Sequence, residues 1–396
     1  MNFSLDAAMY HVVLLLAFVV PLSTAAASIA VGLGTLFIVV WSVRNRTSPQ
    51  FDANILEVLA VYLVCQAFIA AASWEPSISW REVFGEVHRF FPFVFALTFI
   101  KNREQLCGVM IATLLASLLN DAAGIFQCAV LGKARAYGFS HTPTFYGSFM
   151  LMQLPVIIFI AQLKFLSPLW RRLAVVAVGL SLVCLLLSMT RGAWLALAGV
   201  VIIFGVLENR YRKLTAKIFA GLMIAFTVVT FLSPRVHDRV ATFTDTNFQS
   251  NTERVLMWKA AAEIFADYPL TGVGQKIFYH AYNFQYIPAE ARERPGVVGR
   301  GHTHPHNNFL HRASEGGIIG LAAFVGLYAY FFWRFYTQFR REKNFSFGAG
   351  MTALLILTGL QLEGLTDTNM NQVPIMREFW LLAGTFIAAE DIFKPR

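Results

Sequence analysis

Charge is scarce in this sequence of 396 residues. Charged side chains make up 14% of the chain and hydrophobic ones 57%, and the mean hydropathy is +0.56. One water-soluble core cannot bury so much apolar surface, so a soluble globular protein is excluded and lipid is the expected solvent. The 37 Phe and 8 Trp suit a helix bundle with aromatic side chains in lipid contact and at the level of the headgroups.

Several functional motifs are also missing. The net charge of +9 comes without a basic run interleaved with stacking aromatics, so nucleic acid is not the expected partner. No phosphate-binding glycine-rich loop occurs, which argues against a nucleotide site. No Lys or Arg precedes Arg44, so the first two apolar runs predict a helical hairpin and not a cleaved signal peptide. The cysteines lack CxxC or metal-ligand spacing and are expected to be core thiols; they are Cys65, Cys107, Cys128 and Cys184.

Long apolar runs dominate what is present. A membrane span needs about 20 mostly apolar residues. Segments of this kind occur at residues 8–22, 25–43, 55–73, 83–100, 106–126, 143–163, 173–190, 193–208, 215–233, 309–333, 347–365 and 376–391. The expected fold class is an all-α integral membrane protein of about 12 transmembrane helices. Residues 1–232 would hold nine of them and residues 309–396 the other three.

The basic residues orient this bundle. Positively charged short loops tend to stay in the cytoplasm, and most Lys and Arg fall on one side if both chain termini are cytoplasmic. The short outer loops then hold only Arg81, Lys133, Arg135, Arg191 and Arg377. The one long connection, residues 233–308, lies outside. Its length and mixed composition predict an ordered periplasmic subdomain of short helices that carries function.

The densest polar cluster reads GHTHPHNN and runs from Gly301 to Asn308. Three histidines at alternate positions cannot share one helical face, so the segment is predicted to be extended. It would end at a helix start, where Asn307 or Asn308 caps free backbone amides. A histidine in such a place can titrate near neutral pH and act as a general base.

Two other interpretations of the histidines remain open. His302, His304 and His306 could bind a metal, but Pro305 stiffens the run and no nearby carboxylate or cysteine set completes a ligand shell. Alternatively they are interfacial residues with satisfied hydrogen bonds.

Arg191 is expected on the same side as the histidines. It follows an apolar run and precedes Gly192-Ala193-Trp194. A lone arginine between two closely connected spans is costly unless it reaches water, a partner or a functional anion. Snorkelling to the headgroups is the structural alternative.

A helix is predicted at residues 251–267 within the long connection. Ser250 and Glu253 have the spacing of a capping box, and Trp258 belongs to a set of apolar residues at helical intervals. Arg254 would lie in the first turn, where helix amides and a guanidinium can converge on an anion; a solvated charge is the alternative. The sequence PLTGVG at 269–274 then ends the helix in a turn.

Ionisable residues also fall within or beside the spans. Such groups are functional candidates by default, although pairing of Glu86 with Arg89 at i, i+3 would be purely structural. The set comprises Glu86, His88, Arg89, Asp121, Glu363 and Asp367.

Two arginines and a histidine on the outer side suggest a reaction on a lipid-anchored phosphate or diphosphate. The arginines would bind the anion and offset charge developing on the leaving phosphate, and the histidine would take a proton from an attacking hydroxyl. In the absence of a nucleotide site, the substrate must bring its own activation.

The order of the motifs resembles the O-antigen ligase and polymerase family. The matching motifs are Arg191-Gly192-Ala193, Arg254 with Trp258, the turn Pro269-Leu270-x-Gly272-x-Gly274, and His304-Pro305-His306-Asn307 followed by Leu310 and Gly316-Gly317. The resemblance covers about residues 185–325. It implies a metal-independent inverting glycosyltransferase with a glycosyltransferase-C-like bundle. Such an O-antigen ligase moves a glycan from undecaprenyl diphosphate to a sugar hydroxyl of lipid A-core at the periplasmic face of the bacterial inner membrane, completing lipopolysaccharide.

The resemblance also implies roles for residues. Arg191 and Arg254 would bind the donor diphosphate and His306 would be the base, with no metal and no cofactor. The supporting, substrate-binding residues would be His302, His304, Asn307 and Trp258. His304 and His306 could exchange roles.

Other acceptors and another function class remain open. A polymerase would extend a second lipid-linked glycan, and a protein O-oligosaccharyltransferase would glycosylate Ser or Thr. The latter commonly carries extra C-terminal sequence, so an end at Arg396 favours the ligase. A transporter of the same lipid-linked glycan is the remaining alternative, but the two halves show no clear repeat.

Overall fold

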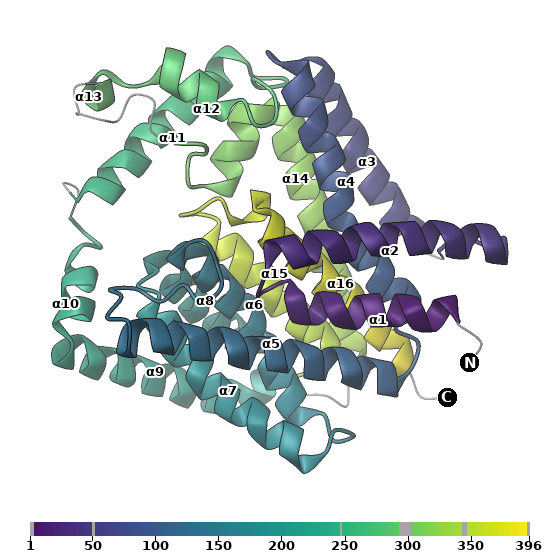
Figure 1. The fold of residues 1–396 in the computed structure, drawn as a ribbon. Helices are drawn as coiled ribbons and strands as arrows, with labels where there is room; N and C mark the ends of the chain where they lie inside the picture. The colour runs from purple at the N-terminus through teal and green to yellow at the C-terminus, as the bar shows by residue number, and fades with distance from the viewer. Residues whose placement is uncertain (1–3, 50–51, 246–247, 293–301, 343–346, 394–396) are drawn as a thin grey trace.

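The structure is a computed structural model that describes residues 4–49, 52–245, 248–292, 302–342 and 347–393. Gly301 of the histidine cluster and both ends of the chain, which were assigned to the cytoplasm, lie outside these ranges. Every regular element within them is a helix (Figure 1). The all-α fold class is therefore confirmed.

Each predicted span coincides with a helix. These helices are α1 (Leu5–Val19), α2 (Thr24–Asn45), α3 (Ala53–Ala71), α4 (Pro76–Phe99), α5 (Arg103–Ala129), α6 (Pro143–Gln162), α7 (Pro168–Leu187), α8 (Arg191–Leu207), α9 (Arg212–Leu232), α14 (Asn308–Arg341), α15 (Ala349–Glu363) and α16 (Val373–Phe393). Among the described residues, seven helices are long and apolar enough to cross a membrane, and α1, α8 and α15 are shorter apolar helices. The protein is an all-α membrane protein.

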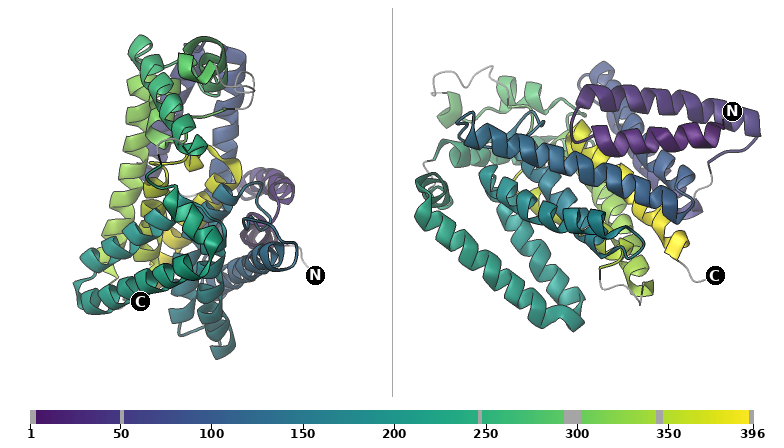
Figure 2. Two further views of the ribbon diagram at one scale, coloured as in Figure 1. Left: turned by 90° about the vertical axis from the view of Figure 1, so that its left-hand side faces the viewer. Right: turned by 60° about the horizontal axis from the view of Figure 1, so that its bottom comes forward.

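The centre of the bundle is formed by α6, α15 and α16, whose side chains are almost all buried. Trp380 of α16 packs between Phe93 of α4 and Phe331 of α14, with ring centroids 5.7 and 5.0 Å away. By contrast, α9 lies along one edge of the bundle beside α8, and most of its side chains are exposed (Figure 2). Apolar side chains on that helix suit lipid contact.

Short helices fill the long connection between α9 and α14. They are α10 (Pro234–Ala241), α11 (Gln249–Asp267), α12 (Phe278–His280), the π-helical turn η2 (Ala281–Tyr286) and α13 (Ala289–Arg292). Helix α11 runs from α10 toward α12 and packs against α14 (Figures 1 and 2). A second, smaller apolar core forms here, around Met257, Ile264 and Phe278.

The helix predicted at 251–267 is confirmed as α11, but its capping box is wrong. The helix begins at Gln249 with Phe248 as the N-cap, which makes no side-chain cap hydrogen bond. Ser250 therefore lies inside the first turn, and Glu253 instead accepts a hydrogen bond from Gln249 at 2.8 Å. The earlier start turns Ser250 toward the cavity described below.

Helix α14 was predicted as one continuous span but is broken at Gly317, where φ is 58° and ψ −155°. The turn at 269–274 fills the break. Backbone amides of Val273 and Gly274 donate to the carbonyls of Ser314 and Glu315, at 3.1 and 2.9 Å, and the amide of Ile318 donates to Pro269 at 2.8 Å. Backbone groups that the break releases thus find partners in the turn.

Glycine is required on both sides of this contact. A Cβ on Gly272 would lie 2.5 Å from the carbonyl carbon of Glu315, and one on Gly317 would lie 2.3 Å from that of Leu270. Both residues also have positive φ. The turn is held from the other side as well, because the amide of Trp74 donates to Val273 at 3.0 Å. The 269–274 turn therefore ties the α3–α4 hairpin to α14.

We expect Gly317→Ala to destabilise the protein by more than about 1 kcal/mol, since alanine is strained at positive φ and its Cβ would collide with backbone. Thermal unfolding of the purified protein in detergent measures the effect. Gly326→Ala in the same helix is the matched control, because a Cβ there meets nothing within 4 Å. Equal melting temperatures for the two variants would contradict a close backbone contact at Gly317.

Candidate active site

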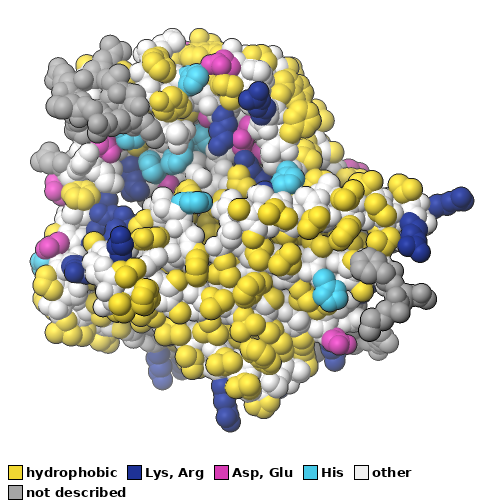
Figure 3. All heavy atoms as spheres, viewed as in Figure 1, with side chains coloured by type: hydrophobic (Ala, Val, Ile, Leu, Met, Phe, Trp, Pro, Cys, Tyr) yellow, Lys and Arg dark blue, Asp and Glu magenta, His cyan; other side chains and the backbone are white. Residues whose placement is uncertain are grey.

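A cavity of about 150 Å³ lies where the start of α8 meets α11 and the loops before α14 and after α15. Its lining comprises Arg135, Thr144, Thr190, Arg191, Gly192, Arg239, Ser250, Arg254, His306, Glu363, Thr366 and Asp367. The three residues predicted to be catalytic, Arg191, Arg254 and His306, therefore meet in one place. Basic and histidine side chains gather in the hollow between the part with α11 and α12 and the part with α1, α2 and α5 (Figure 3).

Arg191 begins α8, as its motif predicted, and is 7% exposed. One guanidinium nitrogen, Nη2, donates to Asn251 Oδ1 at 2.6 Å, while Nη1 donates to the carbonyl and hydroxyl of Thr242. The rings of Phe243 and Phe248 lie 5.7 and 5.5 Å from the guanidinium. Arg191 thus holds the connection between α10 and α11 as well as lining the cavity.

Two further arginines, Arg135 and Arg239, were not predicted as site residues. Each donates to a backbone carbonyl just before α8: Arg135 Nε to Ser188 at 2.8 Å, and Arg239 Nε to Met189 at 3.0 Å. Arg135 Nη2 also donates to Thr190 Oγ1 at 3.3 Å, so both arginines fix the start of α8 while lining the cavity. The sequence carried one signal for Arg135, which stood out as a basic residue in an outer loop.

Arg254 projects from α11 into the same cavity. It forms no hydrogen bond or ion pair with any other residue that the structure describes. Of the four arginines it is the one whose guanidinium is not already used to hold the protein together. A group of this kind is suited to bidentate binding of a phosphate.

The four arginines give the cavity an excess of positive charge. Among the described residues none of them lies within ion-pair distance of a carboxylate. Burial, followed by the charges of Arg239 and Arg191, lowers the pKa of Arg135 to about 10. Burial and the charge of Arg254 likewise lower the pKa of Arg239. Close cations repel one another, so an anion with several negative oxygens would bind favourably here.

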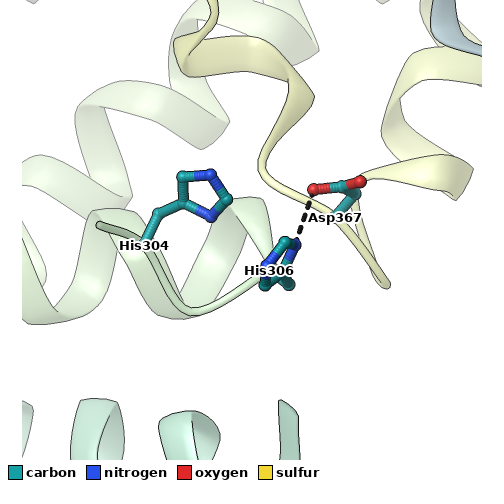
Figure 4. A group of neighbouring side chains, drawn as sticks. All are labelled: His304, His306 and Asp367. Atoms are coloured by element: carbon teal, nitrogen blue, oxygen red, sulfur yellow. Dashed lines mark hydrogen bonds and ion pairs between the residues drawn. The ribbon is translucent and has the colours of Figure 1, made fainter. Parts of the chain in front are cut away.

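His306 and Asp367 form a hydrogen-bonded pair at the edge of the cavity, with Nδ1 and Oδ1 2.9 Å apart (Figure 4). Burial raises the pKa of Asp367, but the hydrogen bond from His306 and the charge of that histidine hold it at about 2. The carboxylate is therefore ionised at neutral pH and accepts a hydrogen bond from Nδ1–H of His306. This orients the imidazole and leaves Nε2 free to accept a proton.

His304 differs from His306 in its surroundings. It does not line the cavity, and its Nδ1 is buried without a partner in the described structure. Burial, followed by the charge of His306 4.5 Å away between ring centroids, lowers the pKa of His304 to about 3. It is therefore neutral, and the geometry favours His306 over His304 as the base.

A metal remains chemically feasible at this pair of histidines. Ligand atoms of His304, His306 and Asp367 all lie within 4.8 Å of one another. The sequence-based argument that no nearby carboxylate could complete a shell is therefore wrong, because the fold brings Asp367 to the histidines. Three ligands with an open position would suit a catalytic metal, so a chelator test belongs with any activity assay.

The other predicted substrate-binding residues contact the protein itself. Trp258 Nε1 donates to the carbonyl of Pro305 at 2.8 Å, and His302 packs edge-on against Tyr282 at 5.8 Å between centroids. Asn307 Oδ1 accepts from the first amides of α14, which confirms the predicted cap. None of the three lines the cavity. Trp258 and Asn307 hold the histidine loop in place, and substrate contact by them remains a prediction.

The buried ionisable residues elsewhere are paired with an opposite charge or hydrogen-bonded to other side chains. Glu86 lies 2.9 Å from Arg312 and 3.8 Å from Arg89, so the structural interpretation holds for that group. Asp121 accepts from Ser181 at 2.7 Å. Glu363 differs in that it also lines the cavity, while accepting from Ser148 at 2.6 Å.

Comparison with known proteins bears on this arrangement. Residues 176–325 match the family model described as O-antigen ligase. The resemblance to that family is confirmed. The matched region includes Arg191, Arg254, the 269–274 turn and His306, and it supports a ligase- or polymerase-type activity. No curated protein gives a significant match to the chain.

We expect Arg254→Gln to weaken binding of inorganic diphosphate to the purified protein by about tenfold or more, because charge-assisted hydrogen bonds contribute about 1.5–3 kcal/mol. Isothermal titration calorimetry in detergent measures the affinity. Lys259→Gln is the matched control, since this lysine projects from the same helix with 57% of its side chain exposed. A similar loss in both variants would mean that diphosphate senses only the overall charge.

Proposed function

We propose that the protein is an O-antigen ligase that transfers a glycan from undecaprenyl diphosphate to a sugar hydroxyl of lipid A-core on the periplasmic face of the inner membrane. The observation that supports this best is the cavity itself. An ionised aspartate orients a histidine at the edge of a pocket with four arginines. A base beside a diphosphate-binding surface is what glycosyl transfer from a lipid diphosphate requires.

The proposed reaction is a single displacement with inversion at the anomeric carbon. The acceptor hydroxyl oxygen attacks the anomeric carbon of the donor sugar, and the bond from that carbon to the phosphate oxygen breaks. The electron pair leaves with undecaprenyl diphosphate, whose growing charge Arg254 and Arg191 offset. His306 Nε2 takes the hydroxyl proton, and Asp367 stabilises the resulting imidazolium.

The acceptor distinguishes the ligase from its relatives. A polymerase would use the same donor and the same base, but with a second lipid-linked glycan as the nucleophile. The cavity geometry is common to both reactions, so the choice of lipid A-core rests on the family description and is tested by supplying each acceptor separately.

Reconstitution of the purified protein with undecaprenyl diphosphate-linked glycan and lipid A-core tests the proposal. We expect glycosylated lipid A-core without added nucleotide and in the presence of a chelator, read as a gel shift of the acceptor. Loss of product with the chelator, restored by metal, would assign His304, His306 and Asp367 to a metal instead. Longer lipid-linked glycan in place of glycosylated lipid A-core would indicate a polymerase.

We expect His306→Gln and Asp367→Asn each to lower kcat by about a hundredfold or more, because a positioned general base contributes about 10²–10⁴ to rate. His141→Gln removes an exposed histidine of an outer loop and serves as the control. Donor binding should persist in all three variants. Normal turnover by the His306 variant would remove the base assignment.

A further inference from the structure

Arg377 is a buried cation that the cavity does not use. It lies in the second turn of α16, is 4% exposed and is not among the residues that line the four-arginine cavity. Its Nη1 donates to Ser28 Oγ at 2.8 Å and its Nη2 lies 3.2 Å from His88 Nδ1. Its Nε is buried and has no partner among the described residues.

No carboxylate compensates this charge. Among the described residues Arg377 forms no ion pair, whereas Arg89 on the neighbouring helix α4 pairs with Glu82 and Glu86. Arg312 in turn pairs with Glu86. A buried cation is costly unless an anion or several hydrogen bonds offset it. Two neutral contacts leave most of the donors of this guanidinium unused.

The two residues that contact this guanidinium are less buried than Arg377 itself. Ser28 is in the second turn of α2 and is exposed, and His88 is only half-buried. Helix α16 packs mainly against α4 and also meets α2, so Arg377, His88 and Ser28 come from three helices that converge here. Ser28 and Arg377 both lie near the predicted periplasmic ends of their helices, which is the level of the lipid headgroups.

The charge pattern of the sequence singles out the same residue. Of the basic residues predicted in short outer loops, Arg135 and Arg191 line the four-arginine cavity. Arg377 is another of these five residues and it is buried, whereas the remaining two, Arg81 and Lys133, are exposed. The other two shielded residues of the set line a proposed anion site, so an anion is the explanation to test for Arg377 as well.

We propose that Arg377, with His88 and Ser28, binds a phosphate group of the acceptor glycolipid at a second anion site. The assignment rests on the proposed function, in which lipid A-core is the acceptor and carries phosphates. The segment from Asp367 to Arg377 connects the two sites, since Asp367 orients the base and Arg377 follows ten positions later on the same stretch of chain. An acceptor held by its phosphate at Arg377 would present its sugars toward His306.

The test compares the acceptor with and without its phosphates. We expect Arg377→Gln to raise the KM for phosphorylated lipid A-core about tenfold, which corresponds to about 1.4 kcal/mol, with kcat and the KM for the donor little changed. With chemically dephosphorylated acceptor, wild type and variant should have the same KM. Arg377→Lys should recover part of the affinity, and Arg81→Gln, an exposed arginine on the outer half of α4, should change nothing.

The result that overturns the proposal is a defect of Arg377→Gln that is equally large with the dephosphorylated acceptor, or one confined to the KM for the donor. A binding measurement distinguishes failure of this second site from failure of the proposed function, because it does not require glycan transfer. Native mass spectrometry of wild type and Arg377→Gln with phosphorylated lipid A reports the site without turnover. If wild type retains lipid A and the variant does not, the site is supported even when no glycan is transferred. Equal retention of lipid A by both proteins removes the acceptor assignment. So does an equal loss of ordinary anionic phospholipid from the variant.

Discussion

The insertion of the 269–274 turn into the break of α14 is the contact on which the site depends. Backbone groups in a membrane protein must find partners within the protein, and here the turn supplies them for the interrupted helix. Arg254 and Trp258 come from the helix that ends at this turn, and His306 comes just before the broken helix. The same contact therefore sets the position of the proposed anion-binding arginine relative to the proposed base.

The cavity is charged in an unusual way for a membrane protein. Three of its arginines, Arg135, Arg191 and Arg239, are held by backbone carbonyls, hydroxyls and an amide oxygen rather than by carboxylates. Neutral oxygens fix the direction of a guanidinium without cancelling its charge. Asp367, the ionised carboxylate at the edge of the cavity, is hydrogen-bonded to His306. The arginines therefore keep their positive charge available where a diphosphate would lie. The carboxylate that orients the proposed base does not neutralise them.

The sequence predicted the fold far better than the details of the site. Apolar length located a helix at every predicted span, because it is a local property, and motif order predicted that Arg191, Arg254 and His306 would meet. It could not predict that Asp367 pairs with His306, since the two are 61 positions apart and no spacing rule connects them. The break at Gly317 was missed because its partner is a distant turn. The capping box at Ser250 failed because a local pattern was overruled by tertiary contacts around Phe248.

Arg191 belongs both to the cavity and to the connection between α10 and α11. A diphosphate that accepted hydrogen bonds from this guanidinium would compete with Thr242 and Asn251, the residues that now hold the N-terminal end of α11. The other end of α11 is fixed through the turn in α14, so only the N-terminal end can respond. If the proposed donor binds here, occupancy of the cavity and the position of α11 would be thermodynamically linked, because a bound diphosphate would loosen one end of the helix that carries Arg254 and its departure would restore that end.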